Sequence, residues 1–281
     1  MPALAEIQMN NFRSLVEEEL ADYRDDFNFE NVVQNHLDIS RFGPWIDQLS
    51  KFHPISGSHV FSSGCGSAGD LYTFMEWGAA AATGIEVDES LARLAKARFQ
   101  ATPFEELVSI QTYDGNILPL PSNSFDIVFS MHVIEHTKNV GLYLAELYRV
   151  VKPGGIIFLE LPNRYFPTEQ HTDIKYIHFL PRRIRDVLIA LLCSALNPYR
   201  LGEELKYKIS SLSDYHIPTP AGIMRSIDAL AERYNLEPET AVFHSYDGVE
   251  LAYNQCSWRS YFGGPEREKT TFRVVIRKKS S

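Results

Sequence analysis

From residue 59 onward, short apolar runs alternate with stretches in which apolar residues recur at helical spacing. The short runs predict buried strands, and the longer periodic stretches predict amphipathic helices. We expect strands over about 59–63, 80–87, 107–113, 126–130, 156–161, 240–246 and 271–277. We expect helices over about 70–77, 90–99 (capped by Ser90), 140–151 (stopped by Pro153-Gly154-Gly155) and 221–234. This alternation predicts an α/β fold with a seven-stranded, mostly parallel sheet, helices on both faces and an antiparallel last strand.

Two regions depart from the alternation. Residues 4–22 and about 29–52 have helical spacing, the second interrupted near Gly43-Pro44. They predict an N-terminal helical cover over 1–55, with a pocket wall or a lid over bound ligand as the alternatives. Residues 162–220 are too long for a simple connection and predict an inserted substrate cap. The cofactor-binding core is then 56–161, and 221–281 completes the α/β core.

The first predicted strand runs into a glycine-rich turn. Gly64, Gly66 and Gly69 follow the apolar Val60-Phe61, and helical spacing resumes directly after them. A strand that turns through glycines into a helix frees backbone N–H groups and lets a ligand approach the main chain. Glu86 follows at the end of the second strand, where an acid accepts hydrogen bonds from ribose hydroxyls. The pattern favours an adenosine-type cofactor, although it also fits dinucleotide sites or a ligand-free turn.

The bulk composition restricts the partners. The formal charge of −9 disfavours a nucleic-acid surface and leaves a small-molecule substrate as the expectation. Three scattered cysteines suggest a reducing compartment, and with neither a leader pattern nor a spanning apolar run we expect a cytoplasmic protein.

Four stretches together resemble the class I S-adenosylmethionine-dependent methyltransferases, especially the branch that acts on quinone precursors and other small molecules. They are 63–69, 84–88, 115–128 and 146–155, in the family's order and spacing. The resemblance implies a Rossmann-like fold and S-adenosylmethionine as cofactor. It assigns the methionine end to the loop of Gly64, Cys65, Gly66 and Gly69, the ribose to Glu86, the adenine to Val87, Asn116 and Ile117, and the methyl region to Ser130, Met131 and His132. Ser62 stands where the family usually has an acid, and Asn116 where an Asp is common.

Methyl transfer to oxygen or nitrogen also needs a place for a proton. His171, after the fifth strand, is the first choice for a base or substrate contact, with Glu169 or Asp173 as an orienting partner. His132 and His136, with Glu135, follow the fourth strand and are the other candidates. Asn163 and Tyr165 are further candidate substrate contacts. Each histidine could instead be a satisfied structural residue. A metal at His171, Asp173 and His178 is conceivable, but their spacing does not favour it and we expect none.

We therefore expect methyl transfer to a small molecule, with a hydroxyl oxygen as acceptor and a histidine as base. An NAD(P)-dependent oxidoreductase and a non-catalytic methyltransferase-like binding protein are the rivals. Tyr148-x-x-x-Lys152 matches a dehydrogenase pair, but Pro153 should end its helix, so we interpret the match as accidental. The apolar helix within 182–196 should be buried as a cap or in a homodimer, with peripheral membrane contact as the alternative.

Overall fold

A computed structural model describes residues 2–21, 29–164, 166–168, 175–195, 219–234, 239–244, 250–252 and 271–279. These residues belong to two compact units. The first comprises Met1–Met131, Ala145–Phe158 and Ile276–Ser281, and the second comprises His132–Leu144 and Leu159–Val275. Each unit is described by itself below.

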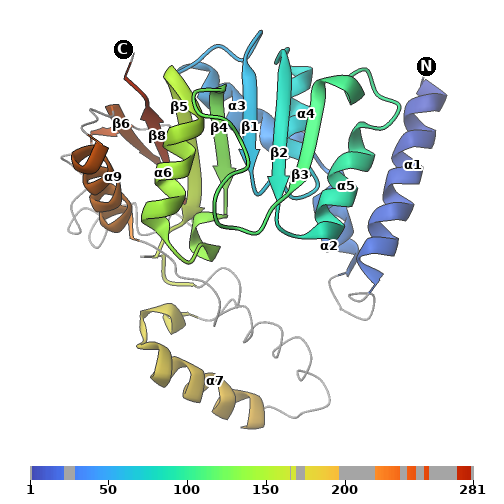
Figure 1. Cartoon of the computed structure of the whole chain (residues 1–281). Helices are drawn as coiled ribbons and strands as arrows, with labels where there is room; N and C mark the ends of the chain where they lie inside the picture. Colours follow the sequence, from blue (N-terminus) through green and yellow to red (C-terminus); the bar gives the residue numbers. More distant parts are fainter. Residues whose placement is uncertain are drawn as a thin grey trace. The chain divides into compact units, whose positions relative to one another are not determined.

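The strands form one sheet with the order β3-β2-β1-β4-β5-β8-β6-β7 (Figure 1). β1 pairs in parallel with both β2 and β4, and β2 pairs in parallel with β3. The prediction of a mostly parallel sheet is confirmed, but the count of seven is wrong because the described residues form eight strands. The additional one, β7, is a short partner that pairs antiparallel with β6. The strand bounds are β1 His59–Ser63, β2 Ala81–Glu86, β3 Val108–Thr112, β4 Phe125–Met131, β5 Val151–Pro162, β6 Glu239–His244, β7 Glu250–Ala252 and β8 Thr271–Arg277.

The centre of the sheet is apolar on both faces, as expected for parallel strands covered by helices. Phe61, Phe129 and Phe158 are almost completely buried, and the rings of Phe129 and Phe158 stack with centroids 5.2 Å apart. Phe74 of helix α4 (Gly69–Glu76) meets Phe129 edge to face at 5.3 Å. Each such fully buried side chain stabilises the fold by about 1.5–3 kcal/mol.

Two helix termini differ from the predictions. Helix α5 (Glu89–Phe99) is capped by Asp88, whose side chain accepts a hydrogen bond from the Leu91 N–H, so the cap is not Ser90. Helix α6 (Val140–Val150) passes directly into β5 at Val151, and Pro153-Gly154-Gly155 lies inside that strand instead of stopping the helix. Gly154, at φ +82°, and Gly155 both bond to Lys278 beside the end of β8, which places an irregularity where β8 returns antiparallel.

The N-terminal helices pack on the outside of the first unit. α1 (Pro2–Glu19) runs beside α5 in Figure 1, and α2 (Phe29–Leu37) contacts α1. Their shared core contains Val16, Val33 and Leu94. A short helix η2 (Ser40–Phe42) and helix α3 (Gly43–Ser50) follow, and α3 begins at the predicted break because Pro44 is suited to a first helical turn. Another short helix, η3 (Glu105–Leu107), precedes β3.

The second unit contains the helices α7 (Arg182–Ala195) and α9 (Pro220–Tyr234), with short helices η4 (Ile134–His136) and η5 (Ile177–Phe179). The described part of the single chain does not bury four aliphatic side chains of α7, and burial of this helix in a homodimer stays a prediction. Ile184, Val187, Leu188 and Leu191 follow helical spacing along one stripe and are all exposed. Among the described helices, none combines the length and apolar character needed to cross a bilayer.

Candidate functional site: a glycine turn and a carboxylate at the carboxyl ends of the strands

The turn after β1 is held against the end of β2 by backbone hydrogen bonds. The N–H groups of Gly64 and Cys65 both donate to the carbonyl oxygen of Ile85, at 2.9 and 3.0 Å. Gly64 and Gly66 have φ values of +66° and +54°, in the left-handed region that glycine adopts without strain. This geometry explains why the chain needs glycine at the first two positions of the motif.

The glycines of this region differ in what surrounds them. A Cβ on Gly66 would meet no atom within 4 Å, so the main chain is open on that side. A Cβ on Gly69 would lie 2.8 Å from the Phe42 ring, and one on Gly84 would lie 2.7 Å from Sγ of Cys65. Gly69 and Gly84 are thus required by packing, whereas the open side of Gly66 can admit a ligand. The Cys65 thiol is buried, which raises its pKa, so this residue offers its backbone rather than its sulfur.

Glu86 connects the end of β2 to the glycine turn. Its Oε2 accepts the Gly66 N–H at 2.8 Å, and its Oε1 accepts the N–H groups of Val87 and Asp88 at 2.8 and 3.2 Å. The residue is only 6% exposed. Three backbone donors fix the carboxylate at the mouth of the turn, and a carboxylate has about four lone-pair sites, so one acceptor direction remains.

Two large aliphatic side chains face solvent, one directly after β2 and one in the loop after β3. Val87 is 57% exposed and Ile117 is 65% exposed, and a Cβ on Gly115 would lie 3.7 Å from Val87. Asn116 donates its side-chain N–H to Asp114 at 3.0 Å, which leaves the amide carbonyl oxygen available as an acceptor. The carboxyl end of β2 and the loop after β3 therefore present apolar surface next to a polar acceptor, as a heterocyclic base requires.

A buried acid lies beneath the turn, and the sequence analysis did not single it out. Ser62 donates its hydroxyl hydrogen to Asp70, which is 5% exposed and also accepts the Leu71 N–H. Burial raises the pKa of Asp70 to about 6, against the opposing effect of these hydrogen bonds. The resemblance implies an acid at the position of Ser62, and Asp70 supplies a carboxyl group in contact with that position. The sequence signal for this role was the position of Asp70 in the first helical turn after the glycines.

The end of β4 leads into a cluster of charges in the second unit. His132, at φ +53°, lies between two carboxylates: its Nδ1 is 3.5 Å from Glu135 and its Nε2 is 3.6 Å from Glu160. Glu160 is also paired with Arg273 at 2.6 Å. Burial by itself would lower the pKa of His132, but the two carboxylates outweigh burial and raise it to about 9. The imidazole is consequently charged at neutral pH.

The remaining predicted residues fall into three groups. His136 is exposed, whereas Ser130 and Asn163 are buried and Met131 is partly buried. His178 is buried and its Nε2 lies 2.8 Å from the carbonyl oxygen of Arg164. Four predicted residues lie outside the described part of the chain, namely Tyr165, Glu169, His171 and Asp173.

The dehydrogenase-like pair does not form a site. Lys152 bonds to Asp126 at 2.8 Å, and the same carboxylate accepts the N–H of His59, the first residue of β1. Lys152 therefore lies at the amino ends of the strands, opposite the glycine turn. Tyr148 is buried on α6 beneath Lys278, whose Nζ lies 4.9 Å from the centroid of its ring. This arrangement agrees with the interpretation of the motif as accidental.

Comparison with known proteins gives the class. A family profile described as "Methyltransferase domain" matches residues 61–159. A demethylmenaquinone methyltransferase of Symbiobacterium thermophilum is 28% identical over 45% of this chain and 54% of its own. A tRNA U34 carboxymethyltransferase of Idiomarina loihiensis is 30% identical over 50% of this chain and 44% of its own. A ubiquinone biosynthesis O-methyltransferase of Coxiella burnetii is 29% identical over 47% of this chain and 56% of its own.

The solved structures agree in fold. An S-adenosylmethionine-dependent methyltransferase from Mesorhizobium loti superposes with a TM-score of 0.55 at 14% identity, covering 86% of this chain and all of that one. The profile and the relatives show a methyltransferase domain over residues 61–159, and the solved structures share its fold, which confirms the resemblance to the S-adenosylmethionine-dependent methyltransferases. The chain spans about half the length of the relatives it matches, so their individual substrates do not transfer to it directly.

Proposed function

We propose that this protein transfers a methyl group from S-adenosylmethionine to a hydroxyl oxygen of a small molecule. The observation that carries the proposal is the combination of an open glycine turn, a carboxylate fixed across it, and exposed apolar side chains beside that carboxylate. These features fit the parts of the cofactor in order: a polar amino-acid end, a ribose diol and an adenine ring.

The residues would share the cofactor as follows. The backbone at Gly64 and Gly66 lies along the amino-acid end, and the free acceptor direction of Glu86 receives a ribose hydroxyl. Val87 and Ile117 lose their exposure against the adenine ring, while the Asn116 carbonyl oxygen accepts from the adenine amino group. Ser130 and Met131, at the end of β4, border the sulfur. Asp70 and Ser62 support the turn from below.

When bound, the cofactor supplies an activated methyl group on a sulfonium; the carbon–sulfur bond breaks as the carbon–oxygen bond forms, and sulfur keeps the electron pair. The protein then has to align the acceptor hydroxyl and receive its proton. We assign the proton to His132, with His136 and His171 as alternatives. Because Glu135 and Glu160 raise the pKa of His132 to about 9, its neutral, proton-accepting form increases with pH. A rate that rises up to about pH 9 supports this assignment, and a rate with no such dependence contradicts it.

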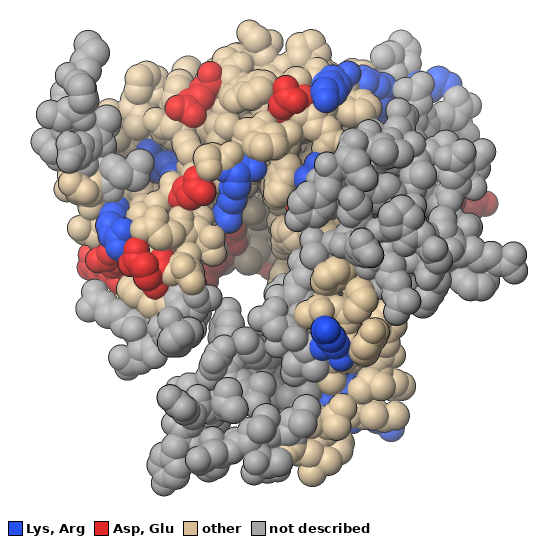
Figure 2. All heavy atoms as spheres, turned by 180° about the vertical axis from the view of Figure 1, so that it is seen from behind, with Lys and Arg blue, Asp and Glu red and all other residues tan. Residues whose placement is uncertain are grey.

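The acceptor is proposed to be small and related to quinone precursors, with no role for nucleic acid. The negative charge of −9 supports this choice, and on the face seen in Figure 2 acidic and basic side chains are interspersed over the described surface. A polyanion would need a continuous basic surface. The names of the quinone-pathway relatives support the same class, whereas the tRNA-modifying relative supports the alternative. Methylation of bulk tRNA but not of phenolic acceptors would decide against our choice.

Calorimetry with S-adenosylhomocysteine tests the site. Glu86→Ala should weaken binding by about 1–3 kcal/mol, roughly ten- to hundredfold, because it removes a charged hydrogen-bond acceptor. Glu89→Ala is the matched control, since Glu89 is an exposed glutamate at the start of α5 and should bind normally. Equal affinities in both variants would remove Glu86 from the site. Binding of NADH instead would favour the oxidoreductase, and cofactor binding without radiolabelled methyl transfer to any phenolic acceptor would favour a binding protein.

The exposed stripe of α7 also belongs to this proposal. We propose that Ile184, Val187, Leu188 and Leu191 contact a lipid surface, since such a stripe next to Arg183 suits an anionic membrane and a lipid-like acceptor. Flotation with anionic vesicles should carry the protein upward, and Leu188→Glu should abolish this. A homodimer in solution that Leu188→Glu dissociates, with no flotation, would instead assign the stripe to a second copy.

A further inference from the structure

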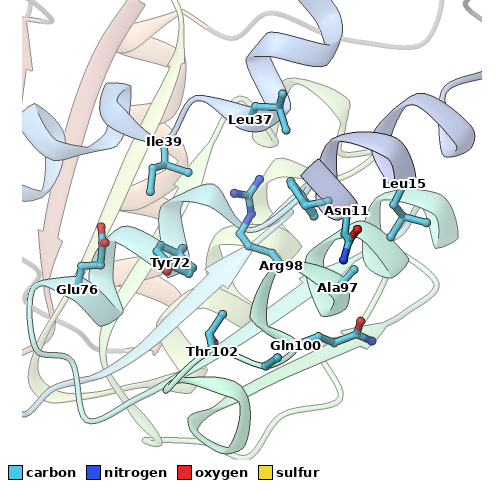
Figure 3. A pocket seen from close by; sticks show the side chains of 12 residues that line it. Asn11, Leu15, Leu37, Ile39, Tyr72, Glu76, Ala97, Arg98, Gln100 and Thr102 are labelled. Carbon is cyan, nitrogen blue, oxygen red and sulfur yellow. The ribbon is translucent and has the colours of Figure 1, made fainter. Parts of the chain in front are cut away.

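A cavity lies in the first unit, and none of its lining residues belongs to the proposed cofactor site. It has a volume of about 460 Å³ and opens among α1, the segment after α2, α4 and the end of α5 (Figure 3). A volume of this size is in the range of small-molecule sites, about 300–1,000 Å³. The question is which kind of molecule its walls would accept.

The walls are mostly apolar and the polar groups are distributed unevenly. Leu15, Leu37 and Ile39 are partly buried and line the cavity (Figure 3). Phe12 is also one of the lining residues. The polar side chains at the rim, such as Asn11, Glu76 and Gln100, are exposed to water. The exception is Arg98, which is 9% exposed and contributes a positive charge to the interior.

Arg98 satisfies only part of its hydrogen-bonding capacity. Its Nε donates to the carbonyl oxygen of Ser67 at 2.5 Å, and its Nη2 donates to the carbonyl oxygen of His36 and to Oγ of Ser67. Its guanidinium lies 4.4 Å from the centroid of the Phe12 ring. Within the described part of the chain, Nη1 has no hydrogen-bond acceptor and the guanidinium forms no salt bridge. The carboxylate of Asp70 acts on the guanidinium electrostatically but forms no salt bridge with it. A ligand anion at Nη1 would add the direct charge-assisted hydrogen bond that Asp70 does not supply.

We propose that this cavity binds an amphipathic monocarboxylic acid, with the carboxylate on Nη1 of Arg98 and the apolar tail along Leu15, Leu37 and Ile39. A charge-assisted hydrogen bond to a guanidinium is among the stronger polar contacts, and the apolar walls contribute by burial. A single carboxylate suits the single free nitrogen. The exposed Glu76 at the rim and the overall negative charge disfavour ligands with several negative charges.

The same guanidinium connects this cavity to the glycine turn. Ser67 lies between Gly66 and Gly69, and it receives two of the hydrogen bonds from Arg98 as well as one contact with Nδ1 of His36 at 3.0 Å. A carboxylate drawn to Arg98 therefore acts on the residue that shapes the cofactor loop. We expect occupancy of the cavity to change cofactor affinity, and by linkage the cofactor to change the affinity for the carboxylate by the same factor. This second part rests on the proposed function.

Calorimetry on the whole protein tests the site with two probes that differ only in charge. Octanoate should bind, and 1-octanol should bind at least about tenfold more weakly, a difference of about 1.4 kcal/mol. Ala97→Phe places a ring in the cavity and should abolish octanoate binding, whereas the matched Ala80→Phe, at an exposed position, should not. Equal binding of the two probes, no binding of octanoate, or normal octanoate binding by Ala97→Phe would each overturn the proposal.

Arg98→Lys is the direct variant, and it keeps the charge while losing the planar fork. It should weaken octanoate binding; if it does not fold, the comparison of the two probes and the two alanine variants decides alone. The coupling is measured separately, as the affinity for S-adenosylhomocysteine with and without saturating octanoate. A change present in the wild type and missing in Ala97→Phe supports it. An unchanged affinity in the wild type refutes the coupling, and failure of S-adenosylhomocysteine to bind at all refutes the proposed function instead.

Discussion

Replacing His132 by alanine probes the charge cluster at the end of β4. The imidazole is the ion-pair partner of Glu135, whose two carboxylate oxygens are fully buried and accept no hydrogen bond within the described structure. Glu160, on the other side of the ring, keeps Arg273 as a partner. His132→Ala therefore leaves one uncompensated buried carboxylate, that of Glu135.

The expected cost follows from this arrangement. Removing one partner of a buried ion pair typically costs about 3–5 kcal/mol. The His132 side chain is 39% exposed, so water can partly replace it and the pair is partly screened. We therefore expect a loss just below that range, about 2–3 kcal/mol. Glu135→Gln made in the His132→Ala protein removes the stranded charge and should restore most of the loss.

Urea unfolding of the wild type, both single variants and the double variant measures these quantities as a double-mutant cycle. We expect a coupling of about 2 kcal/mol between the two sites, well above the error of additive sites. Additive losses, or a His132→Ala variant as stable as the wild type, would show that Glu135 is not stabilised by the imidazole and would refute the reasoning.

The pH dependence gives an independent check of the same cluster. The pKa of His132 is raised from 6.5 to about 9 in the folded protein, so the folded protein binds this proton more tightly than the unfolded chain does. The stabilisation is therefore complete below about pH 6.5 and is lost as the pH rises through about 9. The difference in stability between wild type and His132→Ala should shrink over that window. A difference that grows with pH would contradict the assigned direction.

Three further predictions concern the glycine turn. Gly66→Ala and Gly57→Ala both place a Cβ at positive φ in open space, and each should cost about 1–2 kcal/mol of stability. Only Gly66→Ala should lose affinity for S-adenosylhomocysteine. Equal losses of affinity in the two variants would remove Gly66 from the site. Gly84→Ala should lower the urea-derived stability by about 1–3 kcal/mol, since its Cβ would lie within 3 Å of Cys65, Leu71 and Ile110. The pKa of Asp70 is raised from 3.8 to about 6 in the folded protein. The stability of the wild type should therefore fall relative to that of Asp70→Asn by up to about 3 kcal/mol as the pH rises from about 4 to 6. Parallel curves of stability against pH for the two proteins would contradict this.

Elements with strong local signals were predictable from the sequence. β1 and β8 have the predicted bounds, and the glycine turn leads into α4 as expected, because continuous apolar runs and glycine backbone freedom act over a few residues. The errors arose where two local signals competed. Asp88 and Ser90 are both good caps, and Pro153-Gly154-Gly155 ends a helix as readily as it forms an irregular strand. Which of the two caps and which of the two backbone structures forms depends on how these segments pack against the neighbouring strands.

The cofactor class and the position of the turn and Glu86 were determined by the sequence itself, since backbone conformation and residue spacing are properties of a continuous segment. Only the tertiary structure brought Glu160 and Arg273 to His132, and Arg98 to Ser67. These charges are separated along the chain by as many as 113 residues, as Glu160 and Arg273 are. No local pattern encodes such pairs, because the strength of each interaction depends on burial and distance, which exist only once the elements have packed together.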